Sequence, residues 1–298
     1  MTAIRTVEQA PPAVSAVRHA PHRRRRVRIG TLISASLLVV VTVIILLPVL
    51  LMLVNSVRTD GDVAAHPIGL PNPFAWSNYG FVFEQMNYLR SIANTLLIAA
   101  LSVLGVIVTA SAAAWVIARH ARRWTRGMYQ LFVAGLTIPV FVITTPLYLL
   151  MQQLGLLDTY LAAILIYISF NLPFALFFYV SALRSLPEEL EDAAAIDGCG
   201  PFRTFWHVVF PLLRPATATV TIFVVLYIWT DVTIPLLFLS SDDLKTVTLS
   251  VYSFIGTNGT VQASQLFPAV VLATLPLVVI FLILQRHIVA GITAGIGK

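Results

Sequence analysis

Charged residues are scarce in this chain, because Asp, Glu, Lys and Arg make up 11% of its 298 residues, against about 25% in an average soluble domain. Hydrophobic residues make up 58% of the sequence, and the mean hydropathy is +0.88. A soluble domain cannot enclose so much apolar surface, which excludes a soluble globular enzyme and a disordered protein. The single cysteine, Cys199, has no partner within the chain, which excludes a disulfide scaffold. The composition indicates a polytopic membrane protein.

Long apolar runs, by contrast, are abundant. A helix needs about 20 apolar residues to cross the hydrocarbon core, and only a helix satisfies its own backbone groups in lipid. None of the runs shows the alternating pattern of a membrane barrel. The predicted fold class is an all-α polytopic membrane protein with six transmembrane helices at about 29–54, 92–118, 129–151, 160–183, 208–239 and 266–284.

The distribution of arginine and lysine predicts the orientation of these helices. With a cytoplasmic N-terminus, 16 of the 19 Lys and Arg residues fall on the inner side, and only Arg58, Arg90 and Lys245 fall outside. The positive-inside rule therefore predicts a multi-pass protein of the plasma (inner) membrane with both termini in the cytoplasm.

The first 28 residues form a separate, basic segment. They have no periodic apolar face, which predicts a disordered cytoplasmic tail over 1–28 and a transmembrane domain over 29–298. The run Arg23–Arg26 adjoins a long apolar span, which favours a role in setting topology over nucleic-acid binding.

The cytoplasmic loop over 185–207, between the fourth and fifth predicted spans, carries a full set of helix signals. Pro187 suits the first turn of a helix, and acidic residues follow at the positive end of the helix dipole. Gly198 can adopt the left-handed backbone conformation that ends a helix. We predict a short helix over 187–196, with Leu190, Ala193, Ala194 and Asp197 on one face. The small alanines would let another protein approach closely, whereas the alternative is a connector at the membrane surface.

One acidic residue, Asp231, falls inside a predicted span, where a charge costs about 2.5–3.5 kcal/mol. It can accept hydrogen bonds from a substrate beside Trp229, or it can fix the helix structurally, and the second reading is slightly favoured. Asn171 and Tyr227 are further pathway candidates, as is Tyr167, although each can equally bridge helices. The spacing of Ala110, Ala114 and Ala118 in the second span indicates close helix packing.

Sites for catalysis are absent from the sequence. A P-loop requires Gly-x-x-x-x-Gly-Lys-Ser/Thr, and the final Gly297-Lys298 lacks the hydroxyl residue. The six His and one Cys are scattered, so neither a metal site nor a catalytic nucleophile is predicted. We interpret the chain as a non-enzyme subunit that binds no cofactor or metal itself.

The 185–207 loop resembles the EAA motif of the permeases of binding-protein-dependent ABC importers, which reads Glu-Ala-Ala, three residues, Gly, nine residues, and Ile-x-Leu-Pro. The matching residues are Asp192-Ala193-Ala194, Gly198, Val208, Phe210 and Pro211. The spacing is retained, while Asp192 replaces Glu, Val208 replaces Ile and Phe210 replaces Leu. Since Asp192 is one methylene shorter, Glu191 can share its role.

Other segments resemble the sugar-transporting, maltose-type branch of this family, and the likeness covers about residues 30–298. They are Trp76-Ser77-Asn78-Tyr79, Asn94-Thr95, Trp229-Thr230-Asp231 and the stretch from Gln285 to Gly295. Thr230 stands where Asn is usual.

The resemblance implies a permease subunit of an ATP-driven sugar importer that forms half of a pore. The helix over 187–196 would be a coupling helix that contacts a separate ATPase, through Glu191, Asp192, Ala193, Ala194, Gly198 and Pro211. The tail residues Gln285, Arg286, Gly291 and Thr293 would also touch the ATPase dimer, which uses ATP and Mg²⁺. Asn258 and Gly259 would reach an extracytoplasmic sugar-binding protein, and a homologous permease would complete a heterodimer in the bilayer.

Two other functions are compatible with a polytopic chain. A stand-alone secondary transporter or channel for a small polar solute predicts several paired intramembrane charges and no cytoplasmic docking helix. A scaffold or receptor subunit does not require a polar residue such as Asp231 within a span.

Overall fold

The computed structural model describes residues 29–120, 122–255 and 262–296, and it describes side chains within 34–282. The predicted tail over 1–28 and the predicted contact residues Asn258 and Gly259 lie outside the described residues. All regular elements in the described ranges are helical. They are α1 (Ile29–Asn55), α2 (Asp60–Ala65), α3 (Ser77–Gln85), α4 (Tyr88–Arg119), α5 (Arg123–Gly135), α6 (Val140–Gln153), α7 (Tyr160–Arg184), α8 (Glu189–Ile196), α9 (Pro201–Thr204), η1 (Phe205–Val209), α10 (Phe210–Leu212), α11 (Arg214–Thr230), α12 (Thr233–Phe238), η2 (Asp242–Leu244), α13 (Val247–Ser253) and α14 (Ala263–Ile296).

The chain divides into a unit that ends at Pro48 and a unit that begins at Val49, and each is described by itself. In the first unit, all side chains from Ser34 to Pro48 are exposed on α1, a helix of high hydropathy. An exposed aliphatic helix of this length requires lipid or another protein around it.

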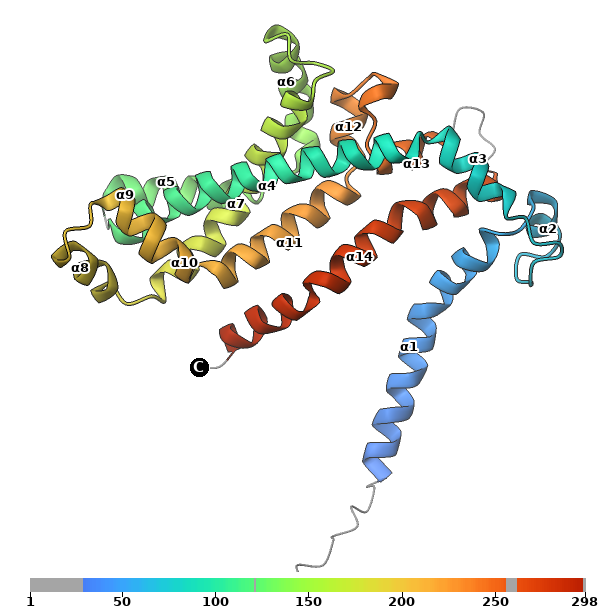
Figure 1. Ribbon diagram of the computed structural model, residues 1–298, viewed down its shortest axis with the longest axis horizontal. Coiled ribbons are helices and arrows are strands. Elements are labelled where there is room, and N and C mark those ends of the chain that lie inside the picture. The colour runs from blue at the N-terminus through green and yellow to red at the C-terminus, as the bar shows by residue number, and fades with distance from the viewer. Residues whose placement is uncertain (1–28, 121, 256–261, 297–298) are drawn as a thin grey trace, which may run out of the picture. The chain divides into compact units, whose positions relative to one another are not determined.

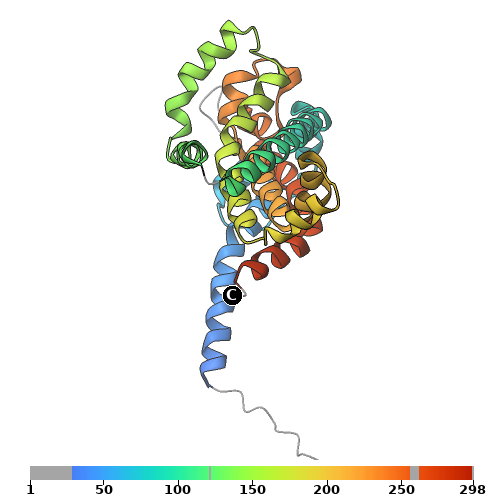
Figure 2. The same ribbon diagram turned by 90° about the vertical axis from the view of Figure 1, so that its left-hand side faces the viewer.

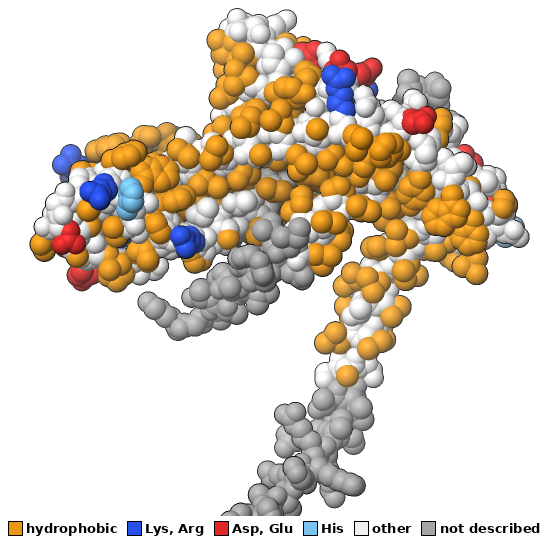
Figure 3. Space-filling view, viewed as in Figure 1, with side chains coloured by type: hydrophobic (Ala, Val, Ile, Leu, Met, Phe, Trp, Pro, Cys, Tyr) orange, Lys and Arg blue, Asp and Glu red, His pale blue; other side chains and the backbone are white. Residues whose placement is uncertain are grey.

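Four helices are long and apolar enough to span a membrane, and the number rises to six if each of two bent helix pairs counts as one span. This agrees with the predicted all-α class with six spans. Apolar side chains cover most of the visible face of the second unit in Figure 3, while charged side chains gather at its left end and along its upper right side.

The core of the second unit is built on α4 and α7, and α11 packs against both (Figure 1). Ala110 and Ala114 are fully buried, which confirms the predicted packing surface on α4. A Cβ at Gly105 would lie 2.3 Å from Cδ1 of Ile168 on α7, so any other residue there would have to displace this side chain. These small residues bring the two long helices into direct contact along the bundle.

The third predicted span, 129–151, is not one helix. It consists of α5 and α6, which are bent by 104° relative to each other, and α6 projects away from α4 and α7 in Figures 1 and 2. The helix ends here because Pro139 has no N–H for a helical bond and disfavours the helical conformation at Ile138. The residues after α5 close short turns instead, such as Ile138 N–H to the Gly135 carbonyl at 3.3 Å.

The fifth predicted span, 208–239, is likewise divided. The segment over 201–212 and α11 are bent by 75°, and α11 ends at Thr230, before the separate helix α12. Pro211 and Pro215 flank the bend and remove two backbone donors there. The range therefore contains α10, α11 and α12 in place of one continuous helix.

The loop over 55–91, between the first two predicted spans and expected on the outer side, is fixed by the Trp76-Ser77-Asn78-Tyr79 motif. The Asn78 amide donates to the carbonyls of Ser56 and Arg58, at 3.3 and 2.9 Å. Arg58 is fully buried, and its Nε lies 2.6 Å from Oδ2 of Asp62 on α2. The motif therefore has a structural role here, while Trp76 and Phe81 remain exposed, as in an interfacial aromatic belt.

The first part of the loop over 240–265, between the fifth and sixth predicted spans and expected on the outer side, is held by Asn94 and Thr95 of α4. The Asn94 amide donates to the carbonyls of Asp243 and Lys245, and the Tyr160 hydroxyl donates to its Oδ1 at 2.8 Å. The hydroxyl of Thr95 accepts from the Val247 N–H at 2.9 Å. This pair links three segments that lie far apart in the sequence.

Asp158, between α6 and α7, holds the first two residues of the same loop, Ser240 and Ser241. Its carboxylate accepts from the Ser241 hydroxyl and from the N–H groups of Ser240 and Ser241, the last two at 2.8 and 2.9 Å. The Ser241 hydroxyl and these N–H groups hold the pKa of the Asp158 carboxyl below its ordinary value.

Because the folded state lowers this pKa, the stabilisation is complete above the unfolded value of about 3.9 and is lost as the pH falls through the folded value. We expect Asp158→Ala to lower the thermal midpoint at pH 7, and the difference from the parent protein to shrink below about pH 4. Thermal unfolding in detergent as a function of pH measures both. A constant difference down to pH 2 would contradict the assignment.

Candidate coupling site

The helix α8 forms as the sequence predicts, although it begins at Glu189 rather than at Pro187. Glu189, Glu191 and Asp192 lie in its first turn, where the helix dipole favours negative charge. The predicted glycine stop is confirmed, because Gly198 has a φ of +79°. The Cys199 N–H bonds to the Ala194 carbonyl at 2.9 Å and the Gly198 N–H to the Ala195 carbonyl at 3.0 Å, which is the Schellman pattern.

A set of charged contacts attaches α8 to the end of α4. Glu191 accepts from Nε1 of Trp115 at 2.8 Å and from Nε of Arg119 at 2.7 Å, one bond to each carboxylate oxygen. Arg119 also donates to the Leu186 carbonyl at 3.3 Å, just before α8. We call Trp115, Arg119 and Glu191 the Glu191 clamp.

The Glu191 clamp is largely shielded from water, since the side chains of Arg119 and Glu191 are 11% and 17% exposed. Hydrogen bonds to charged groups contribute about 1.5–3 kcal/mol in such settings. The additional contact from Arg119 to Glu188 spans 3.6 Å, and Glu188 is 71% exposed, so it adds little. The clamp therefore makes α8 and α4 a connected unit.

The burial of α8 distinguishes an inner face from an outer face. Ala194 is only 7% exposed and faces the chain's own core, whereas Asp192, Ala193 and Asp197 are exposed. Ile196 is 87% exposed and Leu190 is 43% exposed. The predicted common face over Leu190, Ala193, Ala194 and Asp197 is thus divided, and Ile196 belongs to the surface that is free for a partner.

The rest of the EAA-like segment follows α8 in the chain, as α9, η1 and α10. Phe205 is buried and its ring lies 5.3 Å from that of Trp115, so it continues the contact with α4. Phe210 packs on Trp206 at 5.0 Å, and both Phe210 and Pro211 are partly buried. Pro211 thus lies at the bend between the α8 region and α11.

The predicted pathway residues are engaged within the chain. Oδ2 of Asp231 accepts from the Tyr167 hydroxyl and from the Ile234 N–H, both at 2.9 Å, so this carboxylate joins α7 to the start of α12. Trp229 is 3% exposed and donates to the Ala273 carbonyl of α14 at 3.1 Å. Asn171 is buried and donates to the Tyr167 carbonyl. Tyr227 is partly exposed and packs edge-on against Tyr167.

The predicted tail contacts Gln285, Arg286, Gly291 and Thr293 lie on α14, which continues to Ile296, but their side chains lie outside the described residues. No group of three or more potential metal ligands occurs within the ranges that the structure describes.

Sequence reasoning missed the partners of Glu191. Arg119 was counted only as a charge that sets topology, and Trp115 was not singled out. Their spacing of four residues places both side chains on one side of a helix, next to an acidic cytoplasmic segment. That spacing was the available signal.

Comparison with known proteins identifies the family of this chain. Residues 105–294 match the family model described as "Binding-protein-dependent transport system inner membrane component". The diacetylchitobiose uptake system permease protein NgcG of Streptomyces coelicolor is 31% identical over 88% of this chain and 87% of its own length. The melibiose/raffinose/stachyose import permease protein MelC of Bacillus subtilis is 32% identical over 93% of this chain and 98% of its own length.

A solved bacterial ABC transporter involved in the import of the acidic polysaccharide alginate has a TM-score of 0.75, covering 90% of this chain and 99% of that chain, at 20% identity. This likeness concerns the fold. The chain belongs to the family of binding-protein-dependent transport system inner membrane components. It is a multi-pass inner-membrane permease subunit of an ABC importer of the sugar-importer type, and it is not itself the ATPase.

The left-handed residue at the end of α8 gives a direct test of the helix stop. A Cβ at Gly198 would meet nothing within 4 Å, so Gly198→Ala adds only the backbone cost, about 1–2 kcal/mol. We expect faster hydrogen exchange in the peptide over 189–199, measured by mass spectrometry. Gly200→Ala is the matched control, because Gly200 has ordinary backbone angles and equally open space. Equal exchange in both variants would contradict the assigned stop.

Proposed function

We propose that this chain forms half of the translocation pore of an ATP-driven sugar importer and transmits motion from a separate ATPase through α8. The attachment of α8 to α4 by the Glu191 clamp is the observation that carries this proposal. A partner that displaces α8 also displaces the end of α4, and α4 packs along α7. Force applied at a short surface helix would thus reach the core of the bundle.

The proposed ATPase contact is the outer face of α8, with Asp192, Ala193 and Ile196, while Glu191 and Gly198 fix the position and length of the helix. The exposed aliphatic surface of Ile196 would be covered by an apolar groove of the partner. ATP and Mg²⁺ would bind to the ATPase dimer, and this chain would bind no cofactor. Gln285, Arg286, Gly291 and Thr293 would add contacts from the tail.

Both termini would lie in the cytoplasm, on the same side as α8. The placement of arginine at Arg119, Arg184 and Arg203, near that end of the helices, supports this orientation. A homologous permease would complete the pore as a heterodimer.

An extracytoplasmic sugar-binding protein would dock on the opposite side, where Asn258 and Gly259 are proposed contacts. The names of NgcG and MelC refer to oligosaccharides, which supports a sugar as the substrate. The loop over 240–247 is anchored by Asn94 and Asp158, so a docked protein would act on a loop that is connected to α4 and α7.

Among the proposed pathway residues, Tyr227 and Asp231 are partly accessible, whereas Trp229 and Asn171 are buried. Tyr227 and Asp231 would contact a substrate directly. Trp229 and Asn171 would reach it only after α7, α11 or α14 moves.

The proposed function predicts that a loaded binding protein accelerates ATP hydrolysis by the assembled complex in liposomes. A binding protein that prefers the outward-facing state must also favour the closed ATPase, by its differential affinity for the two states. Phosphate release with loaded, empty or no binding protein measures the effect. Equal rates, or uptake by the isolated chain alone, would contradict it and favour a secondary transporter.

Cysteine cross-linking tests the proposed contact face. With Cys199 first replaced by Ser, we expect Ala193→Cys to cross-link to a cysteine placed in the ATPase. Ala194→Cys is the matched control, since it lies one residue further on α8 but is buried. Strong cross-linking of position 194 with none at position 193 would show that α8 presents its other face.

A further inference from the structure

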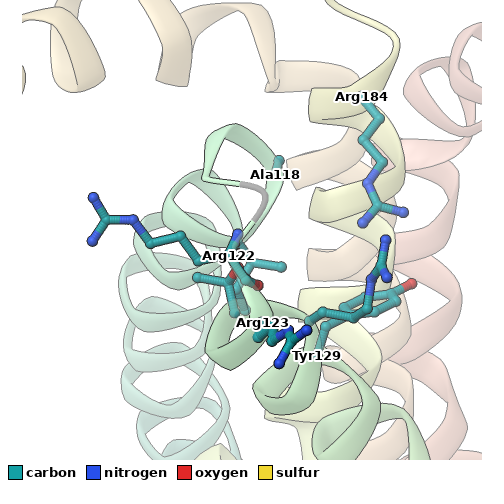
Figure 4. Close-up of a pocket in the computed structure, with 8 residues that line it drawn as sticks. Ala118, Arg122, Arg123, Tyr129 and Arg184 are labelled. Carbon is teal, nitrogen blue, oxygen red and sulfur yellow. Dashed lines mark hydrogen bonds between the residues drawn. The ribbon is translucent and has the colours of Figure 1, made fainter.

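The ends of α4 and α7 and the first turns of α5 enclose a cavity of about 280 Å³ (Figure 4). Its lining residues are Ile117, Ala118, Arg122, Arg123, Thr125, Arg126, Tyr129 and Arg184. Four of these residues are arginines and none is acidic. The cavity is therefore strongly cationic, and it lies next to Arg119, where the Glu191 clamp attaches.

The charges of these arginines are not balanced by any acidic side chain in the described residues. Arg119, the nearest arginine on α4, is paired with Glu191, whereas none of the four lining arginines forms an ion pair in the part of the chain that the structure describes. Arg184 lies over the ring of Tyr129, with its guanidinium carbon 5.3 Å from the ring centroid (Figure 4). This contact positions one guanidinium at the cavity without neutralising it.

The backbone of α5 adds to the positive electrostatic potential in the cavity. Arg123, Thr125 and Arg126 lie in the first turn of this 13-residue helix, so its positive dipole end is at the cavity. Guanidinium groups and a helix N-terminus both favour oxyanions, and arginine bonds phosphate oxygens in a fork. A phosphate group is the ligand chemistry that this combination fits.

The level of the cavity in the membrane identifies the source of the phosphate. Trp124, Met128 and Leu131 are 58%, 39% and 68% exposed, and their spacing places them on one side of α5. This side of α5 is turned away from the residues that line the cavity, so α5 presents an apolar side to lipid and a cationic side to the cavity. Trp124 suits the level of lipid head groups, which places the first turn of α5 and the cavity at that level.

We propose that this cavity binds the phosphate of an anionic phospholipid of the cytoplasmic leaflet. The proposal rests on the orientation given under the proposed function, and basic pockets between helices on that side suit such head groups. A bound lipid would hold α4, α5 and α7 together at the end of α4 that carries Trp115 and Arg119 of the Glu191 clamp.

Native mass spectrometry of the full chain in detergent tests this directly, with phosphatidylglycerol, phosphatidylcholine or inorganic phosphate added in turn. We expect phosphatidylglycerol to bind, and Arg123→Gln with Arg184→Gln to weaken it by about fivefold for each arginine. The control variant, Arg203→Gln with Arg214→Gln, loses the same charge at exposed arginines outside the cavity and should bind as the parent does. Arg123→Lys with Arg184→Lys keeps the charge but loses the fork, so its binding should fall between that of the parent and that of the glutamine variant.

Three results would overturn the proposal. One is equal weakening in the cavity and control variants, which would indicate general charge attraction. Another is equal binding of phosphatidylcholine. The third is displacement of phosphatidylglycerol by inorganic phosphate at a similar concentration, which would identify a free anion as the ligand. Lipid binding does not require ATP or sugar, so these outcomes are independent of the test for transport.

Discussion

The bond between Glu191 and the Trp115–Arg119 side of α4 is the interaction on which the coupling geometry depends. A helix of eight residues has little stability of its own. The position of α8 therefore comes from contacts with larger elements. The two hydrogen bonds of Glu191 stabilise this position and also fix the orientation of its carboxylate against α4. Since both side chains are mostly shielded from water, loss of either would leave the other without its main partner.

Beyond the clamp, small residues make the bundle able to transmit displacement. Gly105, Ala110 and Ala114 bring α4 against α7, so the two helices share one packed surface. At the other end, Asn94 and Asp158 connect the same helices to the loop over 240–247. In the proposed function, a binding protein on one side and an ATPase on the other would act on the same pair of helices.

The sequence allowed the helical class, the number of spans and the α8 stop to be predicted, because apolar length and a glycine at Gly198 are local signals. The spans over 129–151 and 208–239 were drawn through the breaks at Pro139 and after Thr230, because hydropathy stays high through both and a proline alone does not distinguish a kink from the end of a helix. Asp231 was predicted within a span, yet the structure places it at such a break, where it bonds the first residues of α12. The inward side of Ala194 and the partners of Glu191 depend on tertiary contacts, which helical spacing alone could not assign.

The most direct measurement of the central claim is a double-mutant cycle on Arg119 and Glu191, read as sugar uptake by the complete transporter in liposomes. The account predicts that Arg119→Ala and Glu191→Ala each lower uptake by about tenfold, and that the double variant loses no more than either alone. Glu189→Ala, an exposed acid on the same helix, should leave uptake near the parent value. Losses that multiply in the double variant would contradict the account, because the two residues would then act independently.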